Sequence, residues 1–238
     1  MPDIDLAGPG AARRLTGYLV RPEGEGPWPG VVLVHEAFGL DPVQRGLAET
    51  MAGLGYLTLA VDLFSNGGAR RCLVSTFRSL VSGKGPALDD IATGREYLRS
   101  SPECTGKVGI IGFCMGGGFA LLTAPDFDAS APNYGFLPRD ESVLENACPI
   151  VASYGGKDVS LRGAAAKLEA TLTKAGVPHD VKEYPGAGHS FLNGGESGPK
   201  IMRPLLRVAG MGPEPVAAAD AWARIDTFFT EHLGAPAR

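Results

Sequence analysis

The residues best suited to covalent chemistry are a cysteine, an aspartate and a histidine, in that order along the chain. Cys114 lies within residues 112–117, whose pattern is Gly-x-Cys-x-Gly-Gly, between an apolar run and a run of small residues. This is the pattern of a nucleophile in a tight strand-to-helix turn, with cysteine as the nucleophile. The helix N-terminus that follows favours a thiolate through the positive end of its dipole. The alternative is a glycine-rich turn around a buried, inert cysteine.

A base and a residue that orients it follow downstream. Asp158 comes soon after one apolar run, and His189 lies in a glycine-rich loop after the next β-rich run. Taken singly, Asp158 fits a turn or helix N-cap and His189 fits a surface loop. Their order matches nucleophile, acid and histidine in α/β-hydrolases, and both follow strand ends, where open α/β sheets keep their sites. The sequence therefore predicts a Cys114–His189–Asp158 triad.

The segments that must position these residues alternate between short β-rich runs and longer helical stretches. This alternation predicts a mostly parallel central sheet with helices on both faces. Strands are predicted at 31–34, 56–61, 108–112, 149–154 and 180–184, with an edge strand at 17–20. Helices are predicted at 44–54, 87–99, 116–122, 163–174 and 218–233. His35 closes one buried strand, where we expect it to line the site, whereas His179 and His232 are expected at the surface.

The length of 238 residues suits one α/β domain, and we expect residues 1–238 to fold as a single unit. Two long stretches, 62–86 and 193–215, interrupt the alternation of strands and helices. Long excursions of this kind often form caps or binding loops. We therefore expect both stretches to supply walls of a pocket.

The amino-acid composition indicates which partners and which cellular compartment to expect for this protein. The formal net charge is −4, from 22 basic and 26 acidic residues, and no basic stripe favours nucleic acid. No apolar run has the roughly 18 residues that a membrane span requires, and the first residues lack a secretory pattern. The cysteines Cys72, Cys104, Cys114 and Cys148 form no Cys-x-x-Cys pair. We therefore expect a cytoplasmic protein with reduced thiols, no membrane or nucleic-acid partner, and a monomeric or homodimeric state.

Five motifs together resemble the dienelactone hydrolase family, a cysteine branch of the α/β-hydrolases. The resemblance covers about residues 16–192 and the final helix. The matching motifs are His35-Glu36-Ala37-Phe38-Gly39, Asp62-Leu63-Phe64, Gly112-Phe113-Cys114-Met115-Gly116-Gly117, Gly155-x-x-Asp158 and Gly188-His189-Ser190-Phe191.

The resemblance implies an α/β-hydrolase fold and a role for each site residue. Cys114 would be the nucleophile, His189 the base and Asp158 the residue that orients it. Glu36 would lie near the resting thiol and help to govern when the thiol ionises. The backbone N–H groups of Met115 and Ala37 would form the oxyanion hole. None of these roles requires a metal or an organic cofactor.

The sequence departs from the family where its members grip a substrate carboxylate with arginines. Ser65-Asn66 and Leu192-Asn193 occupy the corresponding places, and residues 194–215 form a longer segment than in the smallest members. Arg70, Arg71, Arg78 and Arg203 are the candidates for binding an anionic substrate. The predicted reaction is hydrolysis of a small ester or lactone through an acyl-enzyme, with the nature of the substrate left open.

Three other interpretations remain to be weighed. A non-catalytic binding protein could share the fold, because one fold hosts many functions. A redox sensor built on Cys114 would need a resolving cysteine, and Cys104, the nearest in sequence, lies before the far end of the predicted strand. Hydrolysis of a thioester or a peptide on the same scaffold is the third.

Overall fold

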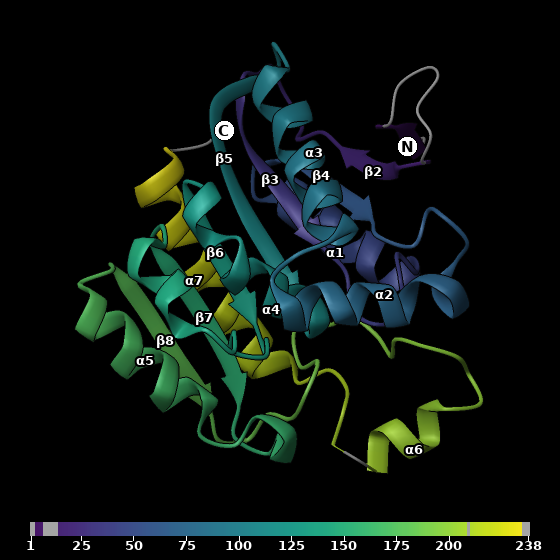
Figure 1. The fold of residues 1–238 in the computed structure, drawn as a ribbon, viewed down its shortest axis with the longest axis vertical. Helices are drawn as coiled ribbons and strands as arrows, with labels where there is room; N and C mark the ends of the chain where they lie inside the picture. The colour runs from purple at the N-terminus through teal and green to yellow at the C-terminus, as the bar shows by residue number, and fades with distance from the viewer. Residues whose placement is uncertain (1–2, 7–13, 209, 235–238) are drawn as a thin grey trace.

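The computed structural model describes residues 3–6, 14–208 and 210–234. Within them an eight-stranded sheet has the strand order β1-β2-β4-β3-β5-β6-β7-β8 (Figure 1). The pairs β1–β2 and β2–β4 are antiparallel, and the other neighbouring pairs are parallel. The strands are β1 (Asp3–Asp5), β2 (Thr16–Val20), β3 (Trp28–Val34), β4 (Leu57–Asp62), β5 (Cys104–Phe113), β6 (Ala129–Asn133), β7 (Ile150–Gly155) and β8 (His179–Tyr184).

Helices cover both faces of the sheet, as the alternation of segments predicts. They are α1 (Pro42–Gly53), α2 (Ala69–Ser82), α3 (Pro86–Ser100), α4 (Met115–Leu122), α5 (Ala164–Ala175), α6 (Arg203–Val208) and α7 (Pro215–Leu233). Side chains that alternate along β3 belong to two different cores, because successive residues of a strand point to opposite faces. Val31 and Leu33 pack with α1 and α7, whereas Val32 and Val34 pack with α3 and α4.

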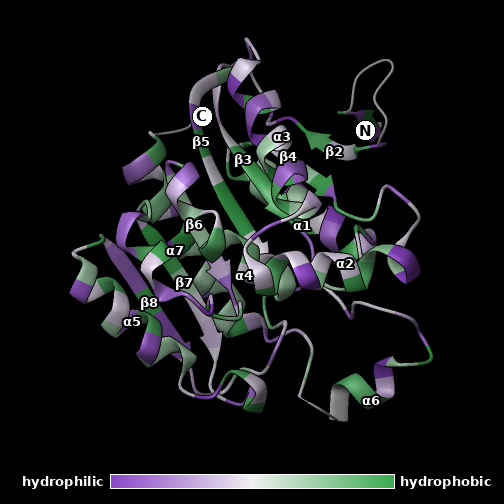
Figure 2. Cartoon of the chain, viewed as in Figure 1, coloured by the Kyte–Doolittle hydropathy of each residue, from purple (hydrophilic) through white to green (hydrophobic). Residues whose placement is uncertain are grey.

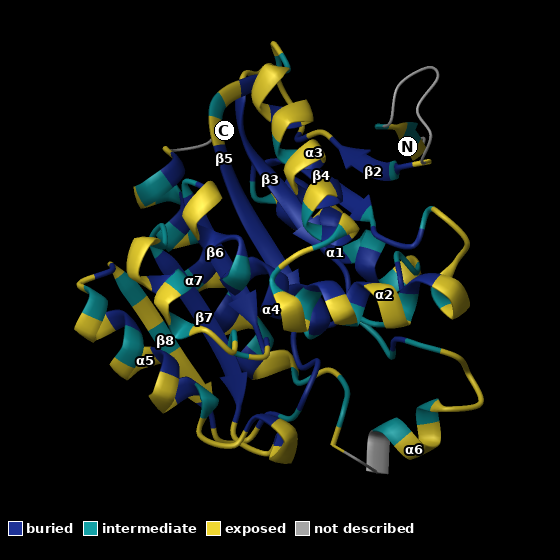
Figure 3. Ribbon diagram, viewed as in Figure 1, coloured by how far each residue is buried: buried dark blue, intermediate teal, exposed yellow. Residues whose placement is uncertain are grey.

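Burial follows the position of each strand in the sheet. Every residue of β3 is buried, and the central strands are dark blue in Figure 3. In the edge strand β8 every residue except Tyr184 is exposed or partly buried, and the strand is hydrophilic in Figure 2. Parallel strands covered on both faces need apolar side chains at nearly every position, whereas an edge strand does not.

The structure corrects several sequence-based boundaries. The prediction that residues 17–20 form an edge strand is wrong, because β1 pairs along the outer side of β2. The strand predicted at 108–112 begins earlier, at Cys104. The stretch 62–86 contains the helix α2, and the strand β6 was not predicted.

The final helix, α7, buries one apolar side against the sheet. Ala221, Ile225 and Phe229 are fully buried, and Tyr56 packs edge-on against Phe229. This helix agrees with the one predicted at residues 218–233. Among the described residues, no helix combines the length and the apolar character that a membrane crossing requires.

Candidate active site

Cys114 occupies a tight turn between β5 and α4. Its backbone has φ 54° and ψ −113°, and its N–H donates to the carbonyl of Asn133 at 3.1 Å. A methyl group at Gly112 would lie 2.0 Å from the carbonyl oxygen of Gly116, and one at Gly116 would lie 2.0 Å from that of Val34. Only glycine lets the strand, the turn and the neighbouring β3 approach so closely. The flanking glycines are therefore a packing requirement of the bend that presents Cys114.

Asp158 follows β7 and uses its two carboxylate oxygens differently. Oδ1 accepts hydrogen bonds from the backbone N–H and the hydroxyl of Ser160, at 3.0 and 2.6 Å, and so caps the short 3-10 helix Val159–Leu161. Oδ2 lies 2.5 Å from Nδ1 of His189. Asp158 therefore caps the 3-10 helix with one oxygen and contacts His189 with the other. Burial opposes ionisation, but the hydrogen bonds from His189 and Ser160 lower the pKa of Asp158 below its usual value.

His189 lies between Asp158 and Cys114. Its side chain is almost fully buried, which by itself would lower its pKa. Hydrogen bonds with Asp158 and with Cys114 outweigh burial and raise the pKa of His189 to about 10. The structure thus brings together the three side chains predicted to form a triad.

The backbone around His189 is fixed by the chain that returns from α6. His189 forms a parallel β-bridge with Met211, and the N–H of Gly212 donates to the carbonyl of His189 at 3.0 Å. A methyl group at Gly188 would lie 1.8 Å from the carbonyl oxygen of Gly210. The end of the 193–215 segment therefore packs against the backbone of Gly188 and His189.

Glu36 lies just beyond the end of β3, with a carboxylate that is only 2% exposed. Oε1 accepts a hydrogen bond from the hydroxyl of Ser190 at 2.8 Å. The amide of Asn193 donates to both oxygens, at 3.2 and 3.3 Å. Burial raises the pKa of Glu36 above its usual value, although the hydrogen bonds from Ser190 and Asn193 act in the opposite direction.

His35 is completely buried and joins two strand ends. Its Nε2 accepts a hydrogen bond from the N–H of Leu63 at 3.1 Å, so its Nδ1 carries the proton donated to the carbonyl of Glu36 at 2.7 Å. Burial lowers the pKa of His35, which fits a neutral imidazole. Its contacts hold β3 to β4 beneath the site. His179 and His232, expected at the surface, are partly buried.

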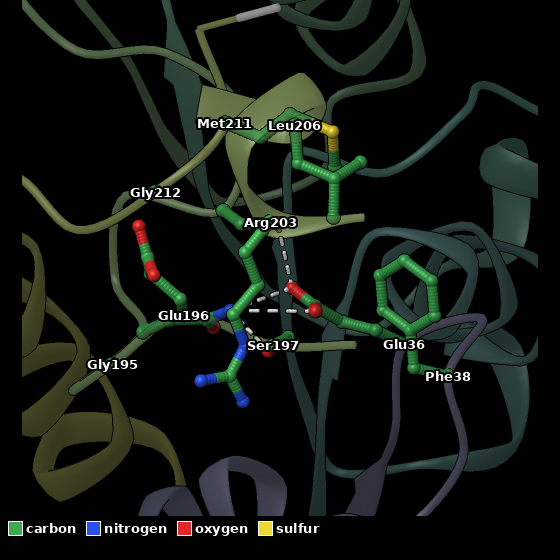
Figure 4. A pocket seen from close by; sticks show the side chains of 11 residues that line it. Glu36, Phe38, Gly195, Glu196, Ser197, Arg203, Leu206, Met211 and Gly212 are labelled. Atoms are coloured by element: carbon green, nitrogen blue, oxygen red, sulfur yellow. Dashed lines mark hydrogen bonds between the residues drawn. The ribbon is translucent and has the colours of Figure 1, made fainter. Parts of the chain in front are cut away.

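A pocket adjoins Glu36 and Ser190 (Figure 4). Its wall includes Phe38, Asn193 and part of the 193–215 segment, with Ser197, Arg203, Leu206 and Met211. Arg203 is the candidate anion-binding arginine that lines this pocket. Arg71 lines a separate pocket of about 250 Å³ between α2 and α3, and Arg70 and Arg78 are exposed on α2.

The two predicted oxyanion-hole residues flank the site. Met115 is the first residue of α4, where a backbone N–H has no acceptor within the helix. Ala37 directly follows Glu36 and is partly buried. Both N–H groups therefore belong to segments that end at the same edge of the sheet as Cys114.

Tyr134 is a site residue that the sequence analysis missed. It follows β6 and is fully buried, with its ring centroid 5.0 Å from that of His189. Among the described residues, the non-glycine residues with positive φ are Cys114, Tyr134 and Ser190, and all three belong to this site. Such backbone strain persists where surrounding packing fixes it, and it is concentrated at functional sites.

The remaining cysteines differ from Cys114 in their surroundings. Cys72 and Cys104 are buried, and burial raises the pKa of Cys148 to about 12. Cys104 and Cys114 lie at opposite ends of β5. Within the part of the chain that the structure describes, no three His, Cys, Asp or Glu side chains are grouped as metal ligands.

A mostly parallel eight-stranded sheet, a cysteine elbow after β5, and an aspartate and a histidine after β7 and β8 define the α/β-hydrolase class. The chain matches the model of the dienelactone hydrolase family over residues 15–233 and belongs to that family. The family and the fold class expected from the sequence motifs are thereby confirmed, and the chain is a hydrolase.

Similar proteins span nearly the whole chain. A carboxymethylenebutenolidase from Rhodococcus opacus is 28% identical over 219 residues, covering 85% of this chain and 81% of the relative. The crystal structure of a dienelactone hydrolase-like promiscuous phosphotriesterase from metagenomic libraries superposes with a TM-score of 0.80 at 24% identity, covering 98% of this chain and 99% of the other. That of an Anabaena variabilis dienelactone hydrolase gives 0.70 at 22% identity, covering 98% and 97%. At these sequence identities the structural similarity is evidence for the fold alone.

Proposed function

We propose that this protein hydrolyses a small carboxylic ester or lactone through an acyl-enzyme on Cys114. The observation that carries the proposal is the position of His189, whose imidazole hydrogen-bonds both Cys114 and Asp158 in a buried setting. A nucleophile, a base and a residue that orients the base are the minimum that covalent acyl transfer needs. Membership in a family with carboxymethylenebutenolidase relatives supports the same substrate class.

In the reactive state the proton of the Cys114 thiol is held by His189, whose raised pKa favours the protonated imidazole. The thiolate then attacks the ester carbonyl and forms a tetrahedral intermediate. As the intermediate collapses, the carbon–oxygen bond to the leaving group breaks, and the departing oxygen takes the proton from His189. His189 next removes a proton from water, which attacks the thioester. The acid is released, and Cys114 leaves as a thiolate beside the protonated His189.

The N–H groups of Met115 and Ala37 are suited to stabilise the oxyanion in both halves of the reaction. Met115 begins the helix α4, so its N–H is part of the positive end of the helix dipole. Donors in oxyanion holes each contribute about 3 kcal/mol to transition-state stabilisation. Asp158 keeps its negative charge in this scheme and stabilises the imidazolium form of His189.

Cys114→Ala tests the proposal with p-nitrophenyl acetate as the substrate. We expect kcat/KM to fall at least about a thousandfold, because the variant has no sulfur to form the acyl-enzyme. Cys148→Ala is the matched control, since it removes a thiol that lies outside the site. Full turnover by Cys114→Ala would refute the proposal.

A folded wild-type protein that turns over no small ester or lactone would favour the non-catalytic binding protein instead. Among the described residues all four cysteines are free, which supports a cytoplasmic location for the enzyme.

A further inference from the structure

An apolar pocket lies between α2, α4 and the loop that follows β6. The two helices pack against each other on one face of the sheet (Figure 1). The pocket has a volume of about 270 Å³. Its apolar lining includes Phe77, Leu80 and Val81 from α2, Leu122 from α4, and Phe136 and Leu137 from the loop. Of the described residues that line it, none belongs to the candidate triad.

Gly118 forms the part of the wall where α4 faces α2. Its N–H donates to the carbonyl of Cys114 at 3.2 Å, one helical turn earlier. A methyl group at Gly117 would lie 2.6 Å from the carbonyl oxygen of Asn133, so the backbone of the elbow requires that glycine. A methyl group at Gly118 would instead lie 3.1 Å from the end of the Leu80 side chain. Glycine at 118 therefore leaves space on the side of the pocket.

Two large apolar side chains of this lining remain exposed to solvent. Val81 is 47% exposed and Phe136 39%. Apolar surface gathered in a concave place is typical of a ligand site. A dry apolar cavity of about 150 Å³ holds benzene, so a pocket of this size has room for a larger apolar group, such as the chain of octanoate.

The charges around the pocket are mainly basic. Arg139 lines it, is exposed, and forms no ion pair within the part of the chain that the structure describes. The helix α2 carries three arginines and no acidic residue, and Lys84 follows it. The acid next to Arg139, Asp140, turns one oxygen to the hydroxyl of Ser142 at 2.6 Å. An apolar pocket with a basic rim is complementary to an anion that has an apolar chain.

We propose that this pocket is a second binding site, which takes a carboxylate with an apolar chain of medium length and pairs the carboxylate with Arg139. The planar guanidinium suits a carboxylate, because its N–H groups match the two oxygens. The apolar chain lies between α2 and α4, where it covers Val81 and Phe136. Cys114 takes no part in this binding, so the inference is independent of the proposed hydrolysis.

Isothermal titration calorimetry with sodium octanoate and with neutral octanamide tests the proposal. We expect one octanoate to bind per chain, about fourfold more tightly for each methylene added from hexanoate to octanoate, because each one is buried. Arg139→Gln should weaken octanoate binding by up to about fivefold, the range of an exposed ion pair, and leave octanamide binding unchanged.

Two further variants locate the ligand. Val81→Trp places a bulky ring on the wall of the pocket and should weaken the binding of octanoate and octanamide alike. Val74→Trp is the matched control, because Val74 is exposed on the same helix but does not line the pocket. Arg203→Gln removes the arginine of the pocket beside Glu36 and should leave octanoate binding unchanged.

Three results would overturn the inference. One is the absence of octanoate binding. Another is binding that Arg203→Gln weakens and Arg139→Gln does not, which would place the ligand beside Glu36. The third is a dimer, seen by sedimentation velocity, that Val81→Trp dissociates and octanoate does not, which would assign this surface to a second copy of the chain. Ester turnover by Cys114→Ala changes none of these readouts.

Discussion

Asp158 Oδ2 and His189 Nδ1 meet at 2.5 Å beyond the carboxyl ends of the neighbouring strands β7 and β8. The parallel register pairs Gly155 with Tyr184, so the two loops leave the sheet side by side. This pair links the catalytic machinery to the stability of the fold. The contact lowers the pKa of Asp158 and helps to raise that of His189 to about 10.

Stability should therefore fall at alkaline pH through His189. A pKa raised from 6.5 to about 10 means that the stabilising contribution is fully present below pH 6.5 and is lost as pH rises toward 10. We expect the free energy of unfolding of the wild type, relative to His189→Gln, to decrease across this window by at most about 1.4 kcal/mol per pH unit. Urea unfolding at pH 7, 8, 9 and 10 measures the difference. A constant difference would show that His189 does not bind the extra proton in the folded state.

The contact between the three residues of the candidate triad was predictable because each residue is marked by a local motif. Glycine is required on both sides of Cys114, because a methyl group at Gly112 or Gly116 would lie 2.0 Å from a carbonyl oxygen, and this requirement is visible in the sequence as Gly-x-Cys-x-Gly. Asp158 and His189 each follow a recognisable strand in the expected order. The order of the strands in the sheet decides which of these side chains meet, and the α/β-hydrolase pattern predicts that order.

The position of Tyr134 and the hydrogen bonds of Asn193 with Glu36 could not be predicted in this way. β6 has the sequence Ala-Ser-Ala-Pro-Asn, with no β-branched or aromatic residue to mark a strand. The contact of Tyr134 with His189 depends on a positive φ and on a neighbour far along the chain. Asn193 stood out in the sequence only as a departure from the family pattern.

The helix α2 was hidden for a related reason. Its buried positions are Cys72, Thr76 and Ser79, which are small or polar, so the usual apolar stripe is weak. The glycines Gly67 and Gly68 just before it suggested a loop. β1 has three residues, too few to show a period, and for this reason β2 was taken for the edge.

Gly116→Ala should damage the fold through the elbow. The new methyl group would meet the carbonyl oxygen of Val34 at 2.0 Å, and backbone cannot yield as a flexible side chain can. We expect a loss of at least about 3 kcal/mol in the free energy of unfolding, together with loss of activity. Gly46→Ala is the matched control: Gly46 lies within α1 with no atom within 4 Å of the new methyl, and the variant should gain about 0.5–1 kcal/mol. Guanidinium unfolding of both variants decides the matter, and equal effects would argue against the close approach of the elbow to β3.

Arg203 should govern the response to substrate charge. It lines the pocket beside Glu36, and its Nε donates to the carbonyl of Gly198 at 3.3 Å, which holds the guanidinium near Ser197 (Figure 4). A charge-assisted hydrogen bond to a substrate carboxylate contributes about 1.5–3 kcal/mol, so Arg203→Gln should raise KM about tenfold for an ester that carries a carboxylate. KM for a neutral ester of the same size should stay within about twofold. Arg71→Gln, in the separate pocket between α2 and α3, is the control and should change neither value. Steady-state kinetics on the two esters separates the possibilities, since an equal rise in both KM values would assign Arg203 to the architecture of the pocket and not to recognition of an anion.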